Sequence, residues 1–454
     1  MKMMLPDNVT NIIQTLQKNG HEAYAVGGCV RDLYLGKTPA DWDITTSASP
    51  KQVKSLFPHT IDTGIAHGTV TVMMGKEGYE VTTYRVDGEY KDGRHPEQVM
   101  FTPLLSEDLC RRDFTINAMA YNEDQGLVDL FGGLEDLQKG IIRCVGNPQE
   151  RLSEDALRML RALRFSAQLG FEIEPNTYHA ICRLAPTIEK VSMERIMVEL
   201  NKLLTSEHPE RMAQVYETGL TKVFLPEFDV MMGTPQNNKH HCYSVGEHTL
   251  HSLGLVPAEK NLRLAMLFHD IGKPATRTTD EEGQDHFYHH QEVGAQMTGE
   301  ILRRLKYDND TIASVKRFVR FHDERPKINR TVIRKAIARI GLSAFPDLFA
   351  IKRADILAQS QYHRQEKMTQ IDEFEAIYRD IIRSGECVEK KNLNISGKDI
   401  MDLGVAQGSL VGDLLEVLFQ HVLEHPEHNQ PQQLLSMANS YIQQGNIPKR
   451  KPVE

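Results

Sequence analysis

Two aspartates separated by one residue, Asp41 and Asp43, are the first residues whose spacing suggests a definite chemistry. Alternate side chains of an extended segment lie on one face, so both carboxylates are predicted to point the same way. Such a pair can hold two Mg²⁺ ions for an in-line phosphoryl displacement. Glu80, in a segment predicted to be a nearby strand, is a candidate third ligand. A lone Asp-x-Asp is more often a solvated turn. The surrounding residues must therefore decide whether this pair is a metal site.

The glycine pair Gly27-Gly28 lies shortly before these aspartates. Backbone amides at glycine can approach a triphosphate closely, and the helix predicted to follow would present its N-terminus to the same anion. Further motifs stand nearby, namely Arg31-Asp32, His67-Gly68-Thr69, 80–85 and 111–120. Together with the aspartates they indicate metal-dependent nucleotidyl transfer on RNA much more specifically than Asp-x-Asp does.

A second group of residues that could perform chemistry is rich in histidine. Nine of the 19 histidines lie between His240 and His322, which predicts a metal site in a separate domain. The candidate ligands are His248, His269, Asp270, His290, His322 and Asp355. Neutral imidazole with carboxylate suits Mn, Fe, Co, Ni or Mg, and an open position on the metal could activate water. A single buried histidine is more often a core residue, but this combination favours a metal centre.

The bulk composition limits the class of protein that positions these residues. A chain of 454 residues predicts about two to four folded units. The net charge of −9 argues against nonspecific coating of nucleic acid, although a local basic groove could still bind phosphates. No apolar run reaches membrane-spanning length, and residues 1–20 lack the apolar run of a signal peptide. Six scattered cysteines without a Cys-x-x-Cys pair predict reduced thiols in a cytoplasmic protein.

The hydrophobic patterns divide the chain into an α/β part and a helical part. A helix is predicted at 8–18 and strands at 23–26, 43–46, 68–73 and 79–84, so the first ~140 residues read as a small α/β domain. A helix is predicted to start at Ser153 as N-cap, with Glu154 and Asp155 in its first turn. Residues 231–238 are rich in turn formers and predict a linker.

The motifs between residues 27 and 120 resemble the class II tRNA nucleotidyltransferase family, which contains the CCA-adding enzymes and bacterial poly(A) polymerases. The resemblance is strong over residues 20–230 and weaker to the C-terminus. It implies that Asp41 and Asp43 are the catalytic Mg²⁺ ligands. It also implies nucleotide contacts from Gly28, Arg31, Arg112, Asp113 and Asn117.

The segment 154–165 resembles the family's base-reading motif, which adds Asp155, Arg158 and Arg161 to the nucleotide site. Asp155 and Arg158 would be neighbours on a helix surface. A carboxylate can accept from the exocyclic amine of cytosine or adenine, and a guanidinium can donate to ring acceptors. The pair could thus select CTP and ATP without a nucleic-acid template. The alternative is that these charges are ordinary helix ion pairs on a solvated face.

The order His248, His269-Asp270, Asp355 resembles HD-superfamily phosphohydrolases, with His290 as the helical histidine and His322 extending the site toward a second metal. This resemblance implies a phosphomonoesterase or cyclic phosphodiesterase for tRNA end repair. A vestigial domain that only positions tRNA is the alternative. The expected fold is multidomain, with an α/β nucleotidyltransferase head followed by all-α neck, HD and tail domains. The expected boundaries are 1–144, 145–232, 233–364 and 365–454.

The choice among products depends on finer resemblances. Residues 87–96 resemble the flexible loop of CCA-adding enzymes, and no segment resembles the basic signature of poly(A) polymerases. The expectation is therefore addition of C, C and A to tRNA from CTP and ATP, with tRNA as partner and neither membrane nor DNA. Poly(A) addition, CC-only and A-only addition stay open. An HD phosphohydrolase with a nucleotide-binding front half, or a noncatalytic tRNA-binding protein, are alternatives of another class.

Overall fold

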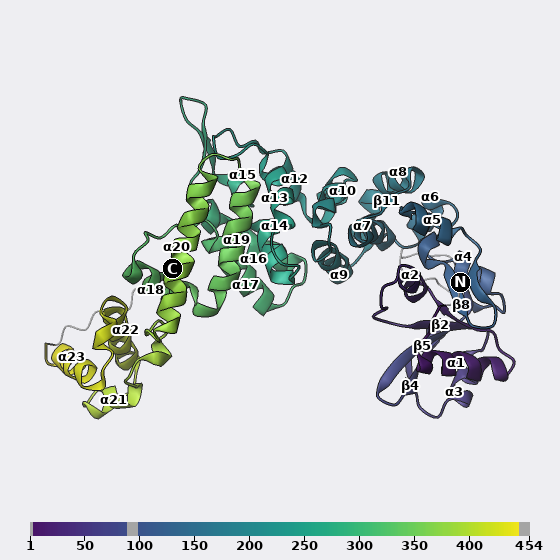
Figure 1. Ribbon diagram of the computed structural model, residues 1–454, viewed down its shortest axis with the longest axis horizontal. Helices are drawn as coiled ribbons and strands as arrows, with labels where there is room; N and C mark the ends of the chain where they lie inside the picture. Colours follow the sequence, from purple (N-terminus) through teal and green to yellow (C-terminus); the bar gives the residue numbers. More distant parts are fainter. Residues whose placement is uncertain (1–2, 89–98, 445–454) are drawn as a thin grey trace. The chain divides into compact units, whose positions relative to one another are not determined.

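The structure is a computed structural model that describes residues 3–88 and 99–444 (Figure 1). Two compact units make up the chain. The first comprises Met1–Val230 with Ile301–Tyr307, and the second comprises Met231–Glu300 with Asp308–Glu454. The division into four domains stays a prediction. Of the predicted flexible loop at 87–96, residues 89–96 lie outside the described residues.

A seven-stranded sheet dominates the start of the first unit, in the order β3-β4-β5-β2-β1-β8-β9. Its strands are β1 (Ala23–Val26), β2 (Asp43–Thr46), β3 (Thr60–Gly64), β4 (Thr69–Met74), β5 (Glu77–Thr83), β8 (Met119–Asn122) and β9 (Gly126–Asp129). The central strand β2 pairs antiparallel with β1 and parallel with β5. The four predicted strands are confirmed, with ends that differ by up to two residues.

The sequence explains why these segments pack as they do. Helix α1 (Asp7–Lys18) buries Val9, Ile12, Ile13 and Leu16, which recur at helical spacing, and confirms the helix predicted at 8–18. Strand β4 consists largely of threonine and valine, residues that suit a pleated surface packed on one face. The two short strands β6 (Arg85–Asp87) and β7 (Val99–Phe101) pair separately from the main sheet.

The prediction that a helix starts at Ser153 is wrong, because Ser153 lies near the end of one helix and a second helix begins just after it. Helix α6 (Pro148–Glu154) ends there and α7 (Leu157–Leu169) begins three residues later. Between them Asp155 is extended, with φ −139° and ψ 106°, and its carboxylate accepts a hydrogen bond of 3.0 Å from the amide of Leu157. Aspartate stabilises a helix better as a cap than inside, because its side chain competes for free backbone amides. Asp155 therefore ends α6 and satisfies the first free amide of α7.

The remainder of the first unit is helical apart from the short parallel pair β10 (Ile141–Ile142) and β11 (Glu172–Ile173). It contains α8 (Pro175–Leu184), α9 (Met193–Leu204) and α10 (Met212–Glu217). Helix α12 (Pro226–Met232) includes Met231, which is fully buried, so the predicted linker begins only after Met232.

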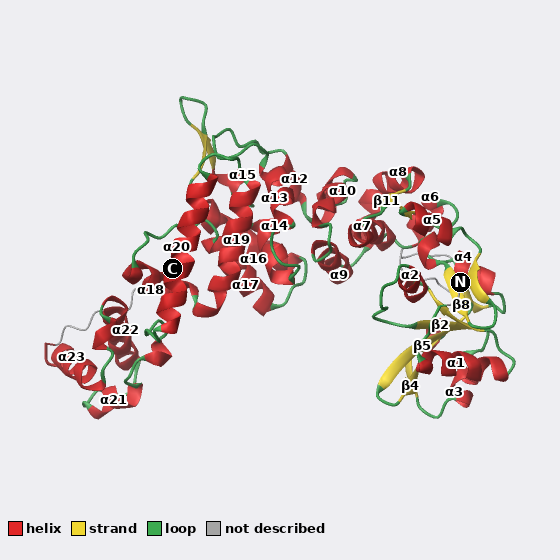
Figure 2. Ribbon diagram, viewed as in Figure 1, coloured by secondary structure: helices red, strands yellow, loops and turns green. Residues whose placement is uncertain are grey.

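The second unit is almost entirely helical, and Figure 2 shows that strands are concentrated in the head. Its longer helices are α13 (Val245–Leu253), α14 (Lys260–Phe268), α16 (His290–Arg304), α17 (Asn309–Phe321), α18 (Arg330–Ile340), α19 (Phe345–Ala358), α20 (Arg364–Arg383), α22 (Ser409–Glu424) and α23 (Pro431–Gln444). An unpredicted hairpin joins β12 (Arg277–Thr279) to β13 (Asp285–Phe287). Within the described residues, no helix is long and apolar enough to cross a membrane.

Candidate active sites

The three predicted carboxylates of the head gather where β2 begins. Asp43 is the first residue of β2, and Asp41 lies two residues before it, separated by Trp42. Glu80 lies directly opposite Asp43, because β2 and β5 pair in parallel at this register. Burial raises the pKa of Asp43 and of Glu80, and the negative charge of Asp41 raises both further. Such carboxylates favour a bound cation, which would relieve their mutual repulsion.

Arg112 supplies the positive charge beside these carboxylates and lowers the pKa of Asp43 against the effect of burial. The fully buried Asp108 holds Arg112 in place at 3.4 Å and also accepts from the hydroxyl of Thr45 on β2 at 3.1 Å. Gly27 has φ +84°, and a Cβ atom there would stand 3.0 Å from Arg112 Nη1. Glycine therefore allows the close approach of this turn to the arginine.

The other predicted nucleotide residues form one chain of hydrogen bonds. Arg31, in α2 (Gly28–Tyr34), donates to Asn117 Oδ1 at 2.8 Å, and Asn117 donates to Asp113 at 3.2 Å. The second oxygen of Asp113 accepts two hydrogen bonds from Arg161, at 2.9 and 2.7 Å. Burial opposes ionisation of Asp113, but Arg161 outweighs it and holds the pKa below the usual carboxyl range. The head is thereby joined to α7.

Phe165 and Glu199 complete this chain and were not anticipated from the sequence. The guanidinium groups of Arg31 and Arg164 lie over the Phe165 ring, at 5.0 and 3.5 Å from its centroid. Glu199, on α9, pairs with Arg164 at 2.8 Å and with Arg161 at 3.6 Å. Cations stacked on an aromatic ring and tied to a buried carboxylate are held in one position.

The side chains of Asp155 and Arg158 each have partners of their own. Asp155 accepts from Arg195 at 2.7 Å in addition to capping α7. Arg158 pairs with Glu154 and donates to the carbonyl oxygens of Arg151 and Arg111, at 2.8 and 3.1 Å. The predicted neighbours are therefore two separately anchored charges, and Arg195 is a positioning residue that sequence spacing could not reveal.

All six predicted metal ligands of the second unit are brought together. In all four histidines, Nδ1 lies near a backbone carbonyl oxygen. The distances are 3.4 Å from His248 to Ala358 and 2.8 Å from His269 to Met266. They are 2.9 Å from His290 to Phe287 and 2.7 Å from His322 to Val319. A carbonyl oxygen can only accept, so each Nδ1 carries the proton and each Nε2 presents a lone pair. Tautomers fixed in this way are typical of metal ligands.

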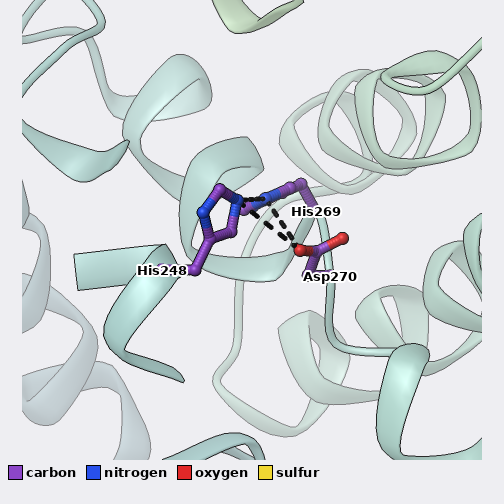
Figure 3. Close-up of side chains that lie close together, drawn as sticks. All are labelled: His248, His269 and Asp270. Carbon is purple, nitrogen blue, oxygen red and sulfur yellow. Dashed lines mark hydrogen bonds and ion pairs between the residues drawn. The ribbon is translucent and has the colours of Figure 1, made fainter. Parts of the chain in front are cut away.

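The Nε2 lone pairs converge in two groups. His248 Nε2 lies 3.2 Å from His269 Nε2 and 2.9 Å from Asp355 Oδ1, and Asp270 Oδ2 lies 3.2 Å from His269 Nε2 (Figure 3). In the second group, His290 Nε2 and His322 Nε2 are 3.3 Å apart, and each lies 3.6 Å from Asp270 Oδ1. Acceptors that face each other this closely without a shared proton fit cations between them.

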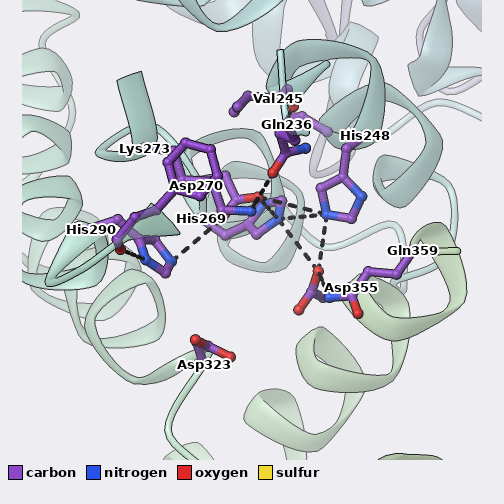
Figure 4. A network of polar contacts seen from close by, with 12 residues as sticks. Gln236, Val245, His248, His269, Asp270, Lys273, His290, Asp323, Asp355 and Gln359 are labelled. Carbon is purple, nitrogen blue, oxygen red and sulfur yellow. Dashed lines mark hydrogen bonds and ion pairs between the residues drawn. The ribbon is translucent and has the colours of Figure 1, made fainter. Parts of the chain in front are cut away.

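Asp270 contributes one carboxylate oxygen to each group and lies at the centre of the network (Figure 4). Its buried Oδ2 has no hydrogen-bond donor of ordinary geometry, although Lys273 Nζ lies 2.7 Å away. Burial opposes ionisation of Asp270, but the neighbouring imidazole of His269 and the ammonium group of Lys273 hold its pKa far below normal. A cavity of about 330 Å³ opens on Asp270, His290, His322 and Asp355.

Lys273 was not predicted as a site residue. Its ammonium group also donates to Gln236 at 2.7 Å and lies 5.4 Å from the Phe287 ring centroid (Figure 4). His241, another lining residue of the cavity, has a buried Nδ1 with no hydrogen-bond partner among residues 3–88 and 99–444, and burial lowers the pKa of this imidazole to about 2. Lys273 follows Asp270 by three residues, a spacing that places two side chains on the same side of a helical turn. This spacing could have predicted the contact between them.

Comparison with protein families assigns the three parts of the chain. Residues 23–143 match the poly A polymerase head domain, residues 170–232 the probable RNA and SrmB-binding site of polymerase A, and residues 239–377 the HD domain. The chain therefore shares its head and RNA-binding regions with the poly(A) polymerase family models. It carries an HD domain in addition.

Relatives within this family are named CCA-adding enzymes. That of Leuconostoc mesenteroides is 57% identical over 193 residues, which cover 42% of this chain and 48% of the relative. That of Levilactobacillus brevis is 51% identical over 218 residues, which cover 48% of this chain and 55% of the relative. The chain therefore spans about half the length of the curated relatives it matches.

Solved structures of this family share the fold over nearly the whole chain. The crystal structure of the Bacillus stearothermophilus CCA-adding enzyme in complex with CTP matches with a TM-score of 0.72 and 28% identity, covering 97% of this chain and 99% of the other. The Thermotoga maritima CCA-adding enzyme complexed with tRNA matches with a TM-score of 0.56 at 19% identity, which shows the fold alone. The expected fold class, an α/β head followed by mainly helical domains, is confirmed.

Proposed function

We propose that this chain is a CCA-adding enzyme, which extends tRNA 3′ ends with C, C and A from CTP and ATP. The observation that carries the proposal is the register of β2 and β5, which places Glu80 opposite Asp43, with Asp41 two residues before Asp43. The names of the relatives and the CTP-bound structure support CCA addition over poly(A) synthesis.

In this reaction the tRNA 3′-hydroxyl attacks the α-phosphate of the nucleotide and pyrophosphate leaves. Asp41, Asp43 and Glu80 are the residues that would hold divalent metal, with Mg²⁺ the expected ion. When bound, the ions supply the positive charge that stabilises the attacking and leaving oxygens. Arg112 lies close enough to Asp43 to contact the phosphates of the same nucleotide. Arg31, Asn117 and Asp113 bind the remaining phosphate and ribose groups.

Base selection by Asp155 and Arg158 is a further part of this proposal. Each is fixed by its own partner, Arg195 or Glu154, so each can present a fixed hydrogen-bonding edge to a base. The carboxylate would accept from the exocyclic amine of cytosine or adenine, which uracil lacks altogether. Arg161 is tied to Asp113 and orients this surface relative to the phosphate-binding residues.

The second unit is proposed to be a phosphohydrolase for tRNA ends, and the four Nε2 lone pairs directed at Asp270 and Asp355 support it. The imidazole and carboxylate donors suit a divalent transition metal such as Mn, Ni, Co or Fe. When bound with an open position, such a metal supplies an activated water for phosphoester hydrolysis. Lys273 lies beside Asp270 and can neutralise charge on the phosphate.

One assay separates the products. The full chain is incubated with a tRNA lacking its 3′ end, Mg²⁺ and each labelled nucleotide in turn, and the ends are sequenced. Two C residues followed by one A support the proposal. A run of A residues would establish a poly(A) polymerase, and addition of only C or only A would establish the partial activities. No incorporation with any nucleotide would overturn nucleotidyl transfer altogether.

The second activity has its own test. Hydrolysis of a 2′,3′-cyclic phosphate on an RNA end is measured with Mn²⁺, Ni²⁺, Co²⁺ or Mg²⁺. Asp270→Ala is expected to abolish hydrolysis and leave CCA addition unchanged. Absence of hydrolysis in the unaltered chain with every metal would leave a vestigial domain that positions tRNA. The cytoplasmic location stays a prediction that rests on the scattered thiols.

A further inference from the structure

A second histidine cluster lies far from the HD centre in the sequence, at the turn between α22 and α23. His421 is in the last turn of α22, His425 ends that helix, and His428 ends the short helix η7 (Pro426–His428). The three imidazole rings stack on one another, with centroids 4.9, 5.1 and 5.2 Å apart. Neither proposed activity uses these residues.

Glu427 brings a carboxylate into the same cluster. Its Oε1 atom lies 3.4 Å from His425 Nδ1 and 3.8 Å from His428 Nε2, and all three ligand atoms lie within 4.8 Å of one another. Donor atoms on a tetrahedral zinc ion, each about 2.0–2.1 Å from the metal, are roughly 3.3 Å apart. The separations in the cluster are therefore close to those that one shared ion would require.

His421 sets the tautomer that such an ion needs. Its Nε2 atom lies 2.8 Å from His428 Nδ1. If His428 Nδ1 carries the proton and donates to His421, then His428 Nε2 faces Glu427 with a free lone pair. This arrangement matches the supporting hydrogen bond that metal-ligating histidines usually make.

The backbone holds the cluster in shape. The amide of His425 donates to the carbonyl of His421 at 2.8 Å, and the amide of His428 donates to that of His425 at 3.0 Å. Asn429, the next residue, bonds to Asn394 and to the carbonyl of Asn392, at 2.9 and 3.1 Å. A turn fixed at both ends loses little further conformational freedom when a ligand binds.

We propose that His425, Glu427 and His428 form a binding site for one divalent transition cation of the Zn²⁺ class, with His421 supporting His428. Two imidazoles and one carboxylate suit Zn²⁺, Ni²⁺, Co²⁺ or Cu²⁺ better than Mg²⁺ or Ca²⁺, which prefer oxygen ligands. A cavity of about 390 Å³ lined by His428, Gln432 and Met437 leaves room for water at the remaining position. The ion would join the end of α22 to the turn before α23.

The first test locates the ion on the unaltered full chain. Histidines are modified with diethyl pyrocarbonate after removal of metals, with and without Zn²⁺ alone, and each is quantified by mass spectrometry. Zn²⁺ is expected to slow modification of His425 and His428 at least tenfold. The internal reference is His208, whose Nδ1 lies 3.2 Å from Glu210 at the same two-residue spacing but without clustered imidazoles among the described residues. Unchanged modification of His425 and His428, or equal protection of His208, would overturn the proposal.

The second test counts ions and is independent of the proposed HD activity. The metal-free chain is titrated with Zn²⁺ against a chromophoric chelator. His425→Ala combined with His428→Ala is expected to take up one equivalent less than the unaltered chain, whereas His208→Ala takes up the same number. His421→Ala should retain the ion with about 10- to 100-fold lower affinity. Equal uptake by the double variant would contradict the site, and the protection experiment still decides if that variant does not fold.

Discussion

Glu80 lies directly opposite Asp43 in the parallel ladder between β2 and β5. The two carboxylates therefore come from adjacent parallel strands of the sheet, and both lie close enough to Asp41 for its charge to raise their pKa. Burial and mutual repulsion raise the pKa of both Asp43 and Glu80, so this site is unfavourable for three negative charges without a cation.

A first prediction concerns pH. Cation binding requires ionised carboxylates, and their raised pKa means that protons compete at a higher pH than for ordinary carboxyl groups. Mn²⁺ affinity should therefore fall as the pH decreases toward the acid range. Glu80→Gln should move this loss to lower pH because it removes one repelling charge. Quenching of Trp42, the single tryptophan, by Mn²⁺ measures binding between the two aspartates. Binding that does not depend on pH would contradict the assignment.

The second prediction concerns catalysis. Asp41→Asn and Asp43→Asn should each reduce CTP incorporation by more than the roughly 100-fold loss typical of a supporting residue. Neither residue belongs to the apolar core, so thermal stability should hardly change. Glu77→Gln, on the same strand as Glu80 but paired with Tyr79, is the matched control and should retain activity. Near-normal incorporation by either aspartate variant would refute the proposed metal ligands.

The third prediction separates two roles of Asp155. Asp155→Ala removes both the cap of α7 and the base-reading carboxylate, and should cost about 1 kcal/mol of stability. Asp155→Ser retains a capping oxygen, so it should be nearly as stable as the original chain. Both variants should incorporate UTP more readily relative to CTP. If Asp155→Ser keeps full discrimination against UTP, the carboxylate only caps the helix.

The fourth prediction concerns the buried pair of Asp113 and Arg161. Arg161→Met leaves Asp113 without its main partner, and breaking a buried pair costs about 3–5 kcal/mol. The lower end is expected because Arg161 is 32% exposed. Asp113→Asn combined with Arg161→Met should recover part of the loss, since no unpaired charge remains. Urea unfolding followed by Trp42 fluorescence reports on this unit, and equal stability of Arg161→Met and the original chain would contradict the prediction.

The same pair gives a pH dependence of fixed sign. The pKa of Asp113 is lower in the folded state than the value of about 3.9 expected when unfolded. Its stabilising contribution is therefore complete above that unfolded pKa and is lost as the pH falls toward the folded one. Asp113→Asn should make unfolding less sensitive to pH below about 4.

A fifth prediction tests the close packing around the HD centre. A Cβ atom at Gly272 would stand 2.1 Å from the carbonyl oxygen of His290 and 2.6 Å from the amide of Gly294. Gly272→Ala must therefore displace α16 and His290 with it, and should weaken metal binding and lower stability. Gly299→Ala on the same helix meets only the flexible end of Lys316, so it is the control that should be tolerated. Titration with Mn²⁺ and thermal unfolding measure both effects.

Local sequence predicted the strands around Asp43 and which histidines and aspartates the second unit brings together, because alternation and the His-Asp doublet are short-range signals. It could not predict that Asp155 separates two helices. The apolar stripe from Ala156 onward marks only the second of them, α7, and gives no sign of where the preceding helix α6 ends. The partners Arg195 and Glu199 were also missed. They come from α9, and only tertiary packing brings that helix against α7. The tautomers of the HD histidines similarly depend on carbonyl groups whose orientation no residue pattern encodes.

The discontinuity of the first unit has a consequence for synthesis of the chain. Ile301–Tyr307 belong to this unit although the HD ligands His269 and His290 precede them, and Tyr307 bonds to Asn201 at 2.6 Å. Ile301, Leu302 and Leu305 are buried. On the ribosome, the N-terminal unit therefore cannot finish folding until much of the HD region has emerged. A fragment that ends at residue 230 should expose apolar surface and aggregate. Neither unit can therefore be produced as a complete folded fragment by cutting the chain at a single position.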